Sequence, residues 1–188
     1  MAEPLPTPPP GKLTREEYRR WAEAQPRGRS ELVDGEVFAM APERIAHAEI
    51  KAAAWLALRQ AIRAAGAPCQ ALPDGITVEV DEDTDFEPDA MVNCGARPDG
   101  NAVAAPNPVV VVEVTSPGTR SVDTGYKLTG YFRVPSIAHY LIVLTGRRML
   151  VHHARRADGG IETRMVTSGR IKLDPPGIAI SLEDLFEG

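Results

Sequence analysis

The chain has 188 residues, of which 43% are hydrophobic and 25% are charged, and its formal net charge is −5. This length suits one hydrophobic core, and no apolar run approaches the roughly 18 residues that a membrane-spanning helix needs. We therefore expect a cytoplasmic protein without a membrane partner. The negative charge argues weakly against broad, nonspecific binding of nucleic acid. Cys69 and Cys94 lack metal-ligand spacing, which favours buried thiols over a zinc site or a disulfide framework.

The first part of the chain predicts a leader, a helix and a hairpin. Residues 1–12 are rich in proline and are expected to be flexible, and residues 13–188 are expected to form one domain. Thr14 is a predicted N-cap, and Glu17 completes a capping box for a helix that ends near residue 24. Two strand-like runs then flank Asp34-Gly35, a strong signal for a two-residue hairpin turn.

The next segments change from helical to strand periodicity. A helix is predicted after Pro42, with apolar residues at helical spacing until Gly66 ends it. Residues 75–80 alternate as a strand does, and the acidic residues 81–85 after them are interpreted as a solvated turn. Asp89 enters a second short apolar run. Residues 95–108 are rich in turn formers and predict a surface loop.

The C-terminal half alternates strand and helix signals. Residues 108–115 form a valine-rich strand, and a helix is expected over about residues 121–132. A hairpin of residues 138–144 and 148–153 follows, with further strands predicted at 161–166 and 177–180. This order of elements predicts an α/β or α+β domain with a mixed central sheet.

Glu113 is the only ionisable residue in the valine-rich strand, and an isolated buried carboxylate is costly. It therefore needs a cation, hydrogen bonds or a metal ion. Asp89, in the neighbouring apolar run, could complete a site for a hard divalent cation such as Mg²⁺ or Mn²⁺. The alternatives are an arginine partner for Glu113 and a turn position for Asp89.

Several sequence motifs, taken together in their order along the chain, resemble those of the Uma family of restriction endonucleases, a branch of the PD-(D/E)xK nuclease superfamily. The resemblance covers about residues 14–155 and depends on Glu31-Leu-Val-Asp-Gly-Glu36, a helix that opens with His47, Pro88-Asp89, Val-Val-Glu113-Val-x-Ser-Pro and Asp123-x-x-x-Lys127-x-x-x-Tyr131. It implies a restriction-endonuclease-like α/β (α+β) fold, in which helices flank a mixed central β-sheet and an N-terminal helix and β-hairpin are added. It also implies a Mg²⁺-dependent (or Mn²⁺-dependent) endonuclease that hydrolyses DNA phosphodiester bonds.

The resemblance assigns a role to each candidate site residue. Asp89 and Glu113 would bind the metal ion, with the backbone carbonyl of Val114 as a further ligand. The superfamily places a lysine two residues after the second acid, where this chain has Thr115, and the similar family uses a lysine on the following helix, which matches Lys127. Lys127 would orient or deprotonate the attacking water. Glu31 matches an N-terminal acid that reaches the same metal.

Other interpretations remain open from the sequence. Lys127 could be a solvated helix residue, His47 a structural or exposed histidine, Tyr131 a core residue, and Asp123 a cap or a partner of Lys127. The missing strand lysine also allows a catalytically inactive nuclease fold that binds within a larger assembly. A hydrolase unrelated to nucleic acid is disfavoured, because its usual motifs are absent from the sequence. Cutting both strands of a duplex favours a homodimer. The target sequence cannot be predicted.

Overall fold

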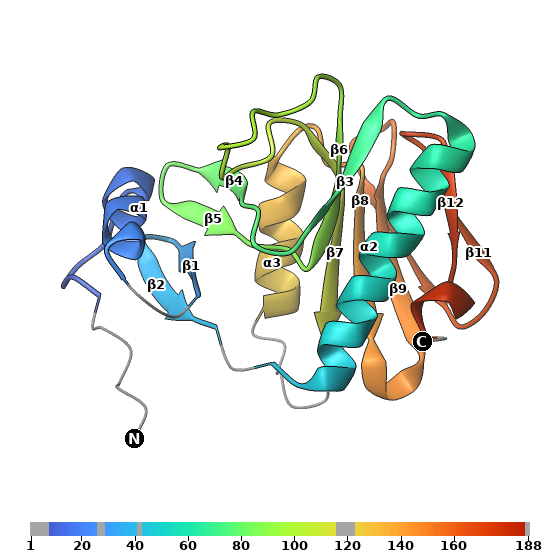
Figure 1. Ribbon diagram of the computed structural model, residues 1–188, viewed down its shortest axis with the longest axis horizontal. Helices are drawn as coiled ribbons and strands as arrows, with labels where there is room; N and C mark the ends of the chain where they lie inside the picture. The colour runs from blue at the N-terminus through green and yellow to red at the C-terminus, as the bar shows by residue number, and fades with distance from the viewer. Residues whose placement is uncertain (1–7, 26–28, 41–42, 116–122, 187–188) are drawn as a thin grey trace.

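A central six-stranded sheet organises the protein, and helices cover both of its faces (Figure 1). The computed structural model describes residues 8–25, 29–40, 43–115 and 123–186, so most of the predicted leader lies outside the described residues. The strand order is β10-β9-β8-β7-β6-β3, and only β7 and β8 are parallel. The strands are β3 (Cys69–Pro73), β6 (Ala90–Cys94), β7 (Pro108–Thr115), β8 (His139–Leu144), β9 (Met149–Arg155) and β10 (Ile161–Val166).

The side chains of β7 alternate between two hydrophobic cores, as its near-continuous burial requires. Val110, Val112 and Val114 face a core formed with α2 (Ile45–Ala65) and the hairpin of β11 (Arg170–Leu173) and β12 (Ile178–Ser181). Val111 faces a second core, to which α3 (Asp123–Arg133) contributes. Glu113 has the same parity as Val111 and contacts α3. The mixed central sheet predicted from the sequence is confirmed.

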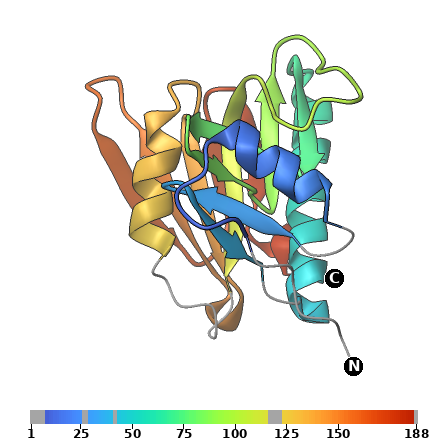
Figure 2. The same ribbon diagram turned by 90° about the vertical axis from the view of Figure 1, so that its left-hand side faces the viewer.

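A smaller sheet of order β2-β1-β5-β4 lies beside α3 and carries α1 (Figures 1 and 2). Its elements are α1 (Arg15–Glu23), β1 (Ser30–Val33), β2 (Glu36–Ala39), β4 (Val78–Asp81) and β5 (Thr84–Phe86). The predicted capping box of Thr14 and Glu17 is present at the start of α1. Asp34 and Gly35 have φ values of 48° and 78°, as the tight turn between β1 and β2 requires. The N-terminal helix and hairpin are therefore confirmed.

Two sequence-based expectations are wrong. Cys69 and Cys94 form a disulfide, because the antiparallel register of β3 and β6 places them directly opposite each other. Asp85 does not lie in a solvated turn, because it belongs to β5, is 2% exposed and is bound by Arg15 and Arg19. Two short helical turns, η1 (Thr145–Arg147) and η2 (Glu183–Leu185), complete the described elements. Among these described elements, no helix is both long enough and apolar enough to cross a membrane.

Candidate active site

Glu113 lies on β7 and contacts α3 through one carboxylate oxygen. The Tyr131 hydroxyl donates to Glu113 Oε1 at 2.5 Å, and Lys127 Nζ lies 3.1 Å from the same oxygen. Burial raises the pKa of Glu113 to about 7; the Lys127 ammonium and the Tyr131 hydrogen bond oppose this rise, while the charges of Asp89 and Glu31 add to it. Glu113 therefore changes its charge close to neutral pH.

Lys127 supplies the ammonium that β7 itself lacks. Thr115 has the same parity as Glu113 on β7, and its hydroxyl bonds to the Val143 carbonyl. Lys127 reaches over from α3, is 6% exposed and places Nζ 2.8 Å from Glu31 Oε1 as well as near Glu113. Burial acts to lower the pKa of Lys127, but the two carboxylates outweigh burial and raise it. Lys127 is therefore a protonated donor and not a base in the metal-free protein.

Glu31 brings the smaller sheet to the site. It lies on β1, and its Oε1 accepts hydrogen bonds from Lys127 Nζ and from the backbone N–H of Glu87, both at 2.8 Å. These two bonds use one carboxylate oxygen. The predicted proximity of Glu31 to Lys127 and Glu113 is therefore present in the structure, whereas its role stays a prediction.

Asp89 is fixed to β7 by two hydrogen bonds. Its backbone N–H donates to the Val112 carbonyl at 2.9 Å, and its Oδ2 accepts from the Val114 N–H at 2.6 Å. Asp89 is therefore held beside the residue that follows Glu113. The N–H and C=O of a strand residue point to the same edge, so the Val114 carbonyl faces the side on which Asp89 lies.

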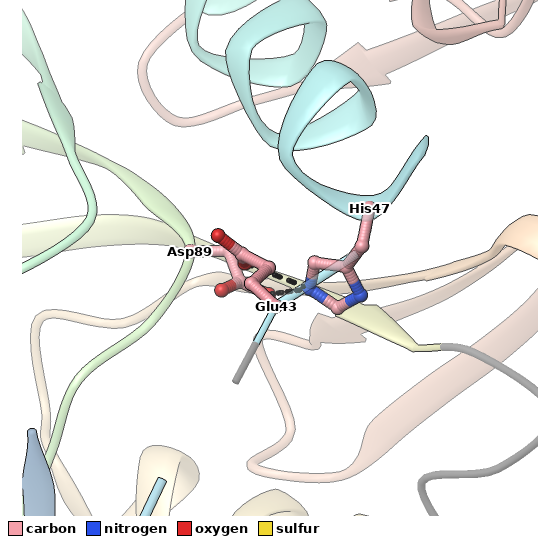
Figure 3. A group of neighbouring side chains, drawn as sticks. All are labelled: Glu43, His47 and Asp89. Atoms are coloured by element: carbon pink, nitrogen blue, oxygen red, sulfur yellow. Dashed lines mark ion pairs between the residues drawn. The ribbon is translucent and has the colours of Figure 1, made fainter. Parts of the chain in front are cut away.

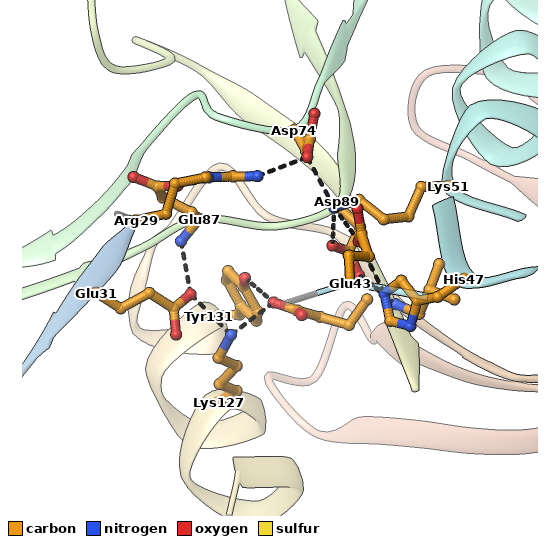
Figure 4. Close-up of polar contacts among 12 residues, drawn as sticks. Arg29, Glu31, Glu43, His47, Lys51, Asp74, Glu87, Asp89, Lys127 and Tyr131 are labelled. Carbon is orange, nitrogen blue, oxygen red and sulfur yellow. Dashed lines mark hydrogen bonds and ion pairs between the residues drawn. The ribbon is translucent and has the colours of Figure 1, made fainter. Parts of the chain in front are cut away.

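A second lysine, Lys51, contacts Asp89 from α2 (Figure 4). Lys51 Nζ lies 3.1 Å from Asp89 Oδ1 and 2.7 Å from both Glu43 Oε1 and Asp74 Oδ2. Burial acts to lower the pKa of Lys51, but its carboxylate partners outweigh burial and raise it. Arg29 also binds Asp74, at 2.7 Å, and pairs with Glu87 at 2.8 Å.

His47 and Glu43 also lie next to Asp89 (Figure 3). His47 Nε2 is 3.4 Å from Glu43 Oε1 and 3.8 Å from Asp89 Oδ2, and one ligand atom from each of the three residues lies within 4.8 Å of the others. The sequence favours a structural or exposed histidine at position 47, but the half-buried ring of His47 also faces Asp89, an acid of the predicted site. Carboxylate oxygens and an imidazole suit Mn²⁺ and other divalent cations.

The charge of the network also suits a cation. Six carboxylates are linked with three cationic side chains: Glu31, Glu43, Asp74, Glu87, Asp89 and Glu113 with Arg29, Lys51 and Lys127. This imbalance leaves an excess of negative charge in a mostly buried region. A divalent ion would offset most of that excess.

The structure brings the four predicted residues Glu31, Asp89, Glu113 and Lys127 into one network, and adds residues that the sequence analysis did not select. The sequence motifs do not point to Lys51, Glu43 or Asp74. Tyr131, expected as a core residue, is fully buried and also donates a hydrogen bond to Glu113. The sequence does hold one signal for Lys51: it lies at helical spacing with the apolar residues Ala54, Leu58 and Ile62, and a lysine on a buried helix face needs carboxylate partners. The side chain of Asp123 lies outside the described residues.

Comparison with known proteins gives consistent matches over nearly the whole chain. The model of the Uma2 family, described as "Putative restriction endonuclease", matches residues 15–187. Uncharacterized protein slr1290 of Synechocystis sp. is 26% identical over 185 residues, which cover 97% of this chain and 96% of that protein. A solved structure from Anabaena variabilis, described as "a putative nuclease belonging to DUF820", is similar with a TM-score of 0.70 over 93% of this chain and 97% of that chain. Its sequence identity of 14% supports a shared fold only.

Proposed function

Because this chain belongs to the Uma2 family of restriction-endonuclease-like proteins, we propose that it is a metal-dependent endonuclease that hydrolyses DNA phosphodiester bonds. The observation that carries the proposal is the convergence of an acid directly before β6 and an acid on the neighbouring β7 with an ammonium from α3. Glu113 and Lys127 are 3.1 Å apart, and Asp89 is hydrogen-bonded to the residue after Glu113. Phosphodiester hydrolysis requires groups of these types.

Asp89 and Glu113 are the residues that would bind Mg²⁺ or Mn²⁺, with the Val114 carbonyl as a further ligand. Donor chemistry supports this assignment, because hard cations prefer carboxylate and carbonyl oxygens. No hydrogen bond is made by Glu113 Oε2 within the described part of the chain. His47 lies beside Asp89 and would favour Mn²⁺ through its imidazole. When bound, the ion supplies Lewis-acid activation of water and offsets charge at the phosphate.

Lys127 would stabilise the negative charge that develops on the phosphate during hydrolysis. Its raised pKa keeps it protonated at neutral pH, so it donates hydrogen bonds and does not remove a proton from water. Glu31 and Glu113 fix its ammonium from two sides, and Tyr131 fixes Glu113. These contacts hold the donor in place before the substrate arrives, which is the arrangement that electrostatic catalysis requires.

A homodimer would present two such sites to the two strands of a duplex, as two-fold symmetry favours. The DNA target and the dimer are both parts of the proposal. Light scattering coupled to size-exclusion chromatography would measure the mass directly, and a mass near 20.3 kDa would contradict the dimer.

The test is a plasmid-nicking assay with Mg²⁺ and with Mn²⁺. We expect the wild-type chain to relax supercoiled DNA, and we expect Glu113→Gln and Lys127→Met each to lower the rate at least about 100-fold, the usual scale for removing one catalytic group. Lys172→Met removes the same charge from an exposed position on β11, away from the site, and should retain the rate. Equal rates in all four proteins would contradict the proposal.

A binding module without catalysis is the second candidate, and one observation favours it. Each of the two acids already has an ammonium partner, Lys51 on Asp89 and Lys127 on Glu113. Binding of labelled DNA by the wild-type chain, without cleavage in either metal, would support this candidate over the endonuclease.

A further inference from the structure

Lys51 holds an unusual position for an ammonium, since it is 7% exposed on the apolar face of α2. An ammonium has three N–H donors, and each has a carboxylate partner here: Glu43 and Asp74 at 2.7 Å and Asp89 at 3.1 Å. The bond to Asp89 is the longest of the three. If it were lost, Lys51 would keep two close partners.

The distribution of lysines in the chain indicates that Lys51 is not a general surface cation. The 21 basic residues include only four lysines, Lys12, Lys51, Lys127 and Lys172, and the other 17 are arginines. Lys12 and Lys172 are exposed, whereas Lys51 and Lys127 are buried and converge on the acids of the site. A lysine ammonium is a compact point charge on a flexible stem, so it can leave one carboxylate without leaving the others.

Asp89 has two oxygens with different surroundings. Oδ2 accepts the Val114 N–H at 2.6 Å, and Oδ1 is the oxygen that Lys51 contacts. A divalent ion that uses Asp89 therefore meets the Lys51 ammonium close to the same carboxylate. Two cations at one carboxylate repel each other strongly in a buried setting.

We propose that Lys51 is a built-in competitor of the divalent ion at Asp89. In the metal-free protein its ammonium neutralises Asp89 and keeps the cluster of acids compatible with burial. Metal binding displaces the ammonium from Asp89, and Glu43 and Asp74 retain it. Lys51 thereby sets the metal concentration at which the site fills. The inference rests on the proposed function, because it presumes a metal site at Asp89.

Isothermal titration of the full chain with Mn²⁺ tests this competition without measuring cleavage. Because Lys51→Met removes a cation next to the metal site and keeps a similar side-chain length, we expect it to lower the Kd at least about tenfold. Lys172→Met is the matched control and should keep the Kd within about twofold of wild type, since its exposed charge is screened. An unchanged or higher Kd for Lys51→Met overturns the inference.

Nuclear magnetic resonance of lysine side chains tests the same point in the wild-type chain, so that the result does not depend on Lys51→Met. With four lysines, the Lys51 signal is identified as the one that Lys51→Arg removes. We expect Mg²⁺ to shift the Lys51 signal with the same midpoint as metal binding, while the signals of Lys12 and Lys172 stay in place. A Lys51 signal that does not move while the metal binds overturns the inference.

The proposed metal site and the proposed competition by Lys51 predict different results, so the failure of one can be told from the failure of the other. If neither the wild-type chain nor Lys51→Met binds Mn²⁺, the proposed metal site is wrong and the inference fails with it. If the wild-type chain binds Mn²⁺ and cuts plasmid but Lys51→Met binds no more tightly, the proposed function stands and only the competition is wrong.

Discussion

The surroundings of Glu113 act on its protonation in two opposite directions. Burial, together with the charges of Asp89 and Glu31, favours the neutral acid, whereas Lys127 and the Tyr131 hydroxyl favour the carboxylate. Burial is the largest of these effects, and it raises the pKa to about 7 from 4.5. The metal-free protein therefore holds a proton near neutral pH that metal binding would have to release.

We predict that this proton makes the stability of the metal-free protein depend on pH. The folded pKa lies above the unfolded value of 4.5, so the contribution of Glu113 is fully present below about pH 4.5 and is lost as the pH rises through about 7. The loss should be on the order of 3 kcal/mol. Glu113→Gln should remove this contribution, so the difference in unfolding free energy between the wild-type chain and Glu113→Gln should change by that amount between pH 4.5 and 8, as measured by urea unfolding.

Glu162→Gln is the matched control for this experiment. Glu162 lies on β10, is paired with Arg164 at the surface and should leave the slope as it is in the wild-type chain. A wild-type slope that persists unchanged in Glu113→Gln would show that another group carries the titration.

At the scale of single elements, α3 determines where the ammonium of Lys127 lies. Gly130 is one turn beyond Lys127 and faces Phe86, a fully buried residue of β5. A Cβ at position 130 would lie 2.5 Å from the Phe86 ring, closer than real contacts allow. The absence of a side chain at Gly130 thus lets α3 approach β5, and this approach delivers Lys127 to Glu31 and Glu113.

We predict that Gly130→Ala displaces α3 and weakens the site without changing any of its residues. Overpacking of this kind costs about 1–3 kcal/mol of unfolding free energy. The rate of plasmid nicking should fall as well, because electrostatic catalysis is sensitive to small displacements. Gly125→Ala lies on the same helix with nothing within 4 Å of the added methyl group, so it should leave both measurements near wild type. Similar losses in the two variants would show that helix packing is not the cause.

The sequence predicts elements well where the signal is local. The capping box at Thr14, the Asp34-Gly35 turn and the end of α2 at Gly66 each depend on a few adjacent residues, and each is present. β3 and β11 were not predicted, because β3 shows no alternation of burial and includes a proline, and β11 is short. The disulfide depends on the register of β3 against β6, which neither segment specifies alone.

The same distinction between local and long-range information applies to the site. Motif order was sufficient to select Asp89, Glu113, Lys127 and Glu31. The partners of Lys51 come from positions 43, 74 and 89, and only the packing of α2 against the sheet brings them together. Asp85 illustrates the opposite error, since a run of acids suggested solvent while Arg15 and Arg19 allow its burial.

At the scale of the whole molecule, the candidate site lies where the smaller four-stranded sheet meets the central six-stranded sheet. Glu31 comes from the smaller sheet, and Glu113 from the central one; Lys127 binds both. Arg29, just before β1, adds a second link through Asp74, which follows β3. Charged contacts between two sheets depend on both being in place, so we propose that residues 13–188 form a single domain.

We predict that the two sheets unfold together. The chain has two tryptophans, Trp21 on α1 beside the smaller sheet and Trp55 on α2, whose indole donates to Ala71 O on β3. In Trp55→Phe the fluorescence of Trp21 reports on the smaller sheet, and in Trp21→Phe that of Trp55 reports on the central one. In each variant, the urea midpoint from tryptophan fluorescence should coincide with the midpoint from circular dichroism of the same protein.

Leu32→Ala tests whether a change in the smaller sheet also destabilises the central sheet. Leu32 is fully buried in the core that α1 forms with β1, and its truncation should cost about 2–5 kcal/mol. If the sheets form one cooperative unit, this change in the smaller sheet lowers the Trp55 midpoint as much as the Trp21 midpoint. A shift confined to Trp21 would mean that the smaller sheet unfolds alone, and that Glu31 can leave Lys127 while Asp89 and Glu113 stay in place.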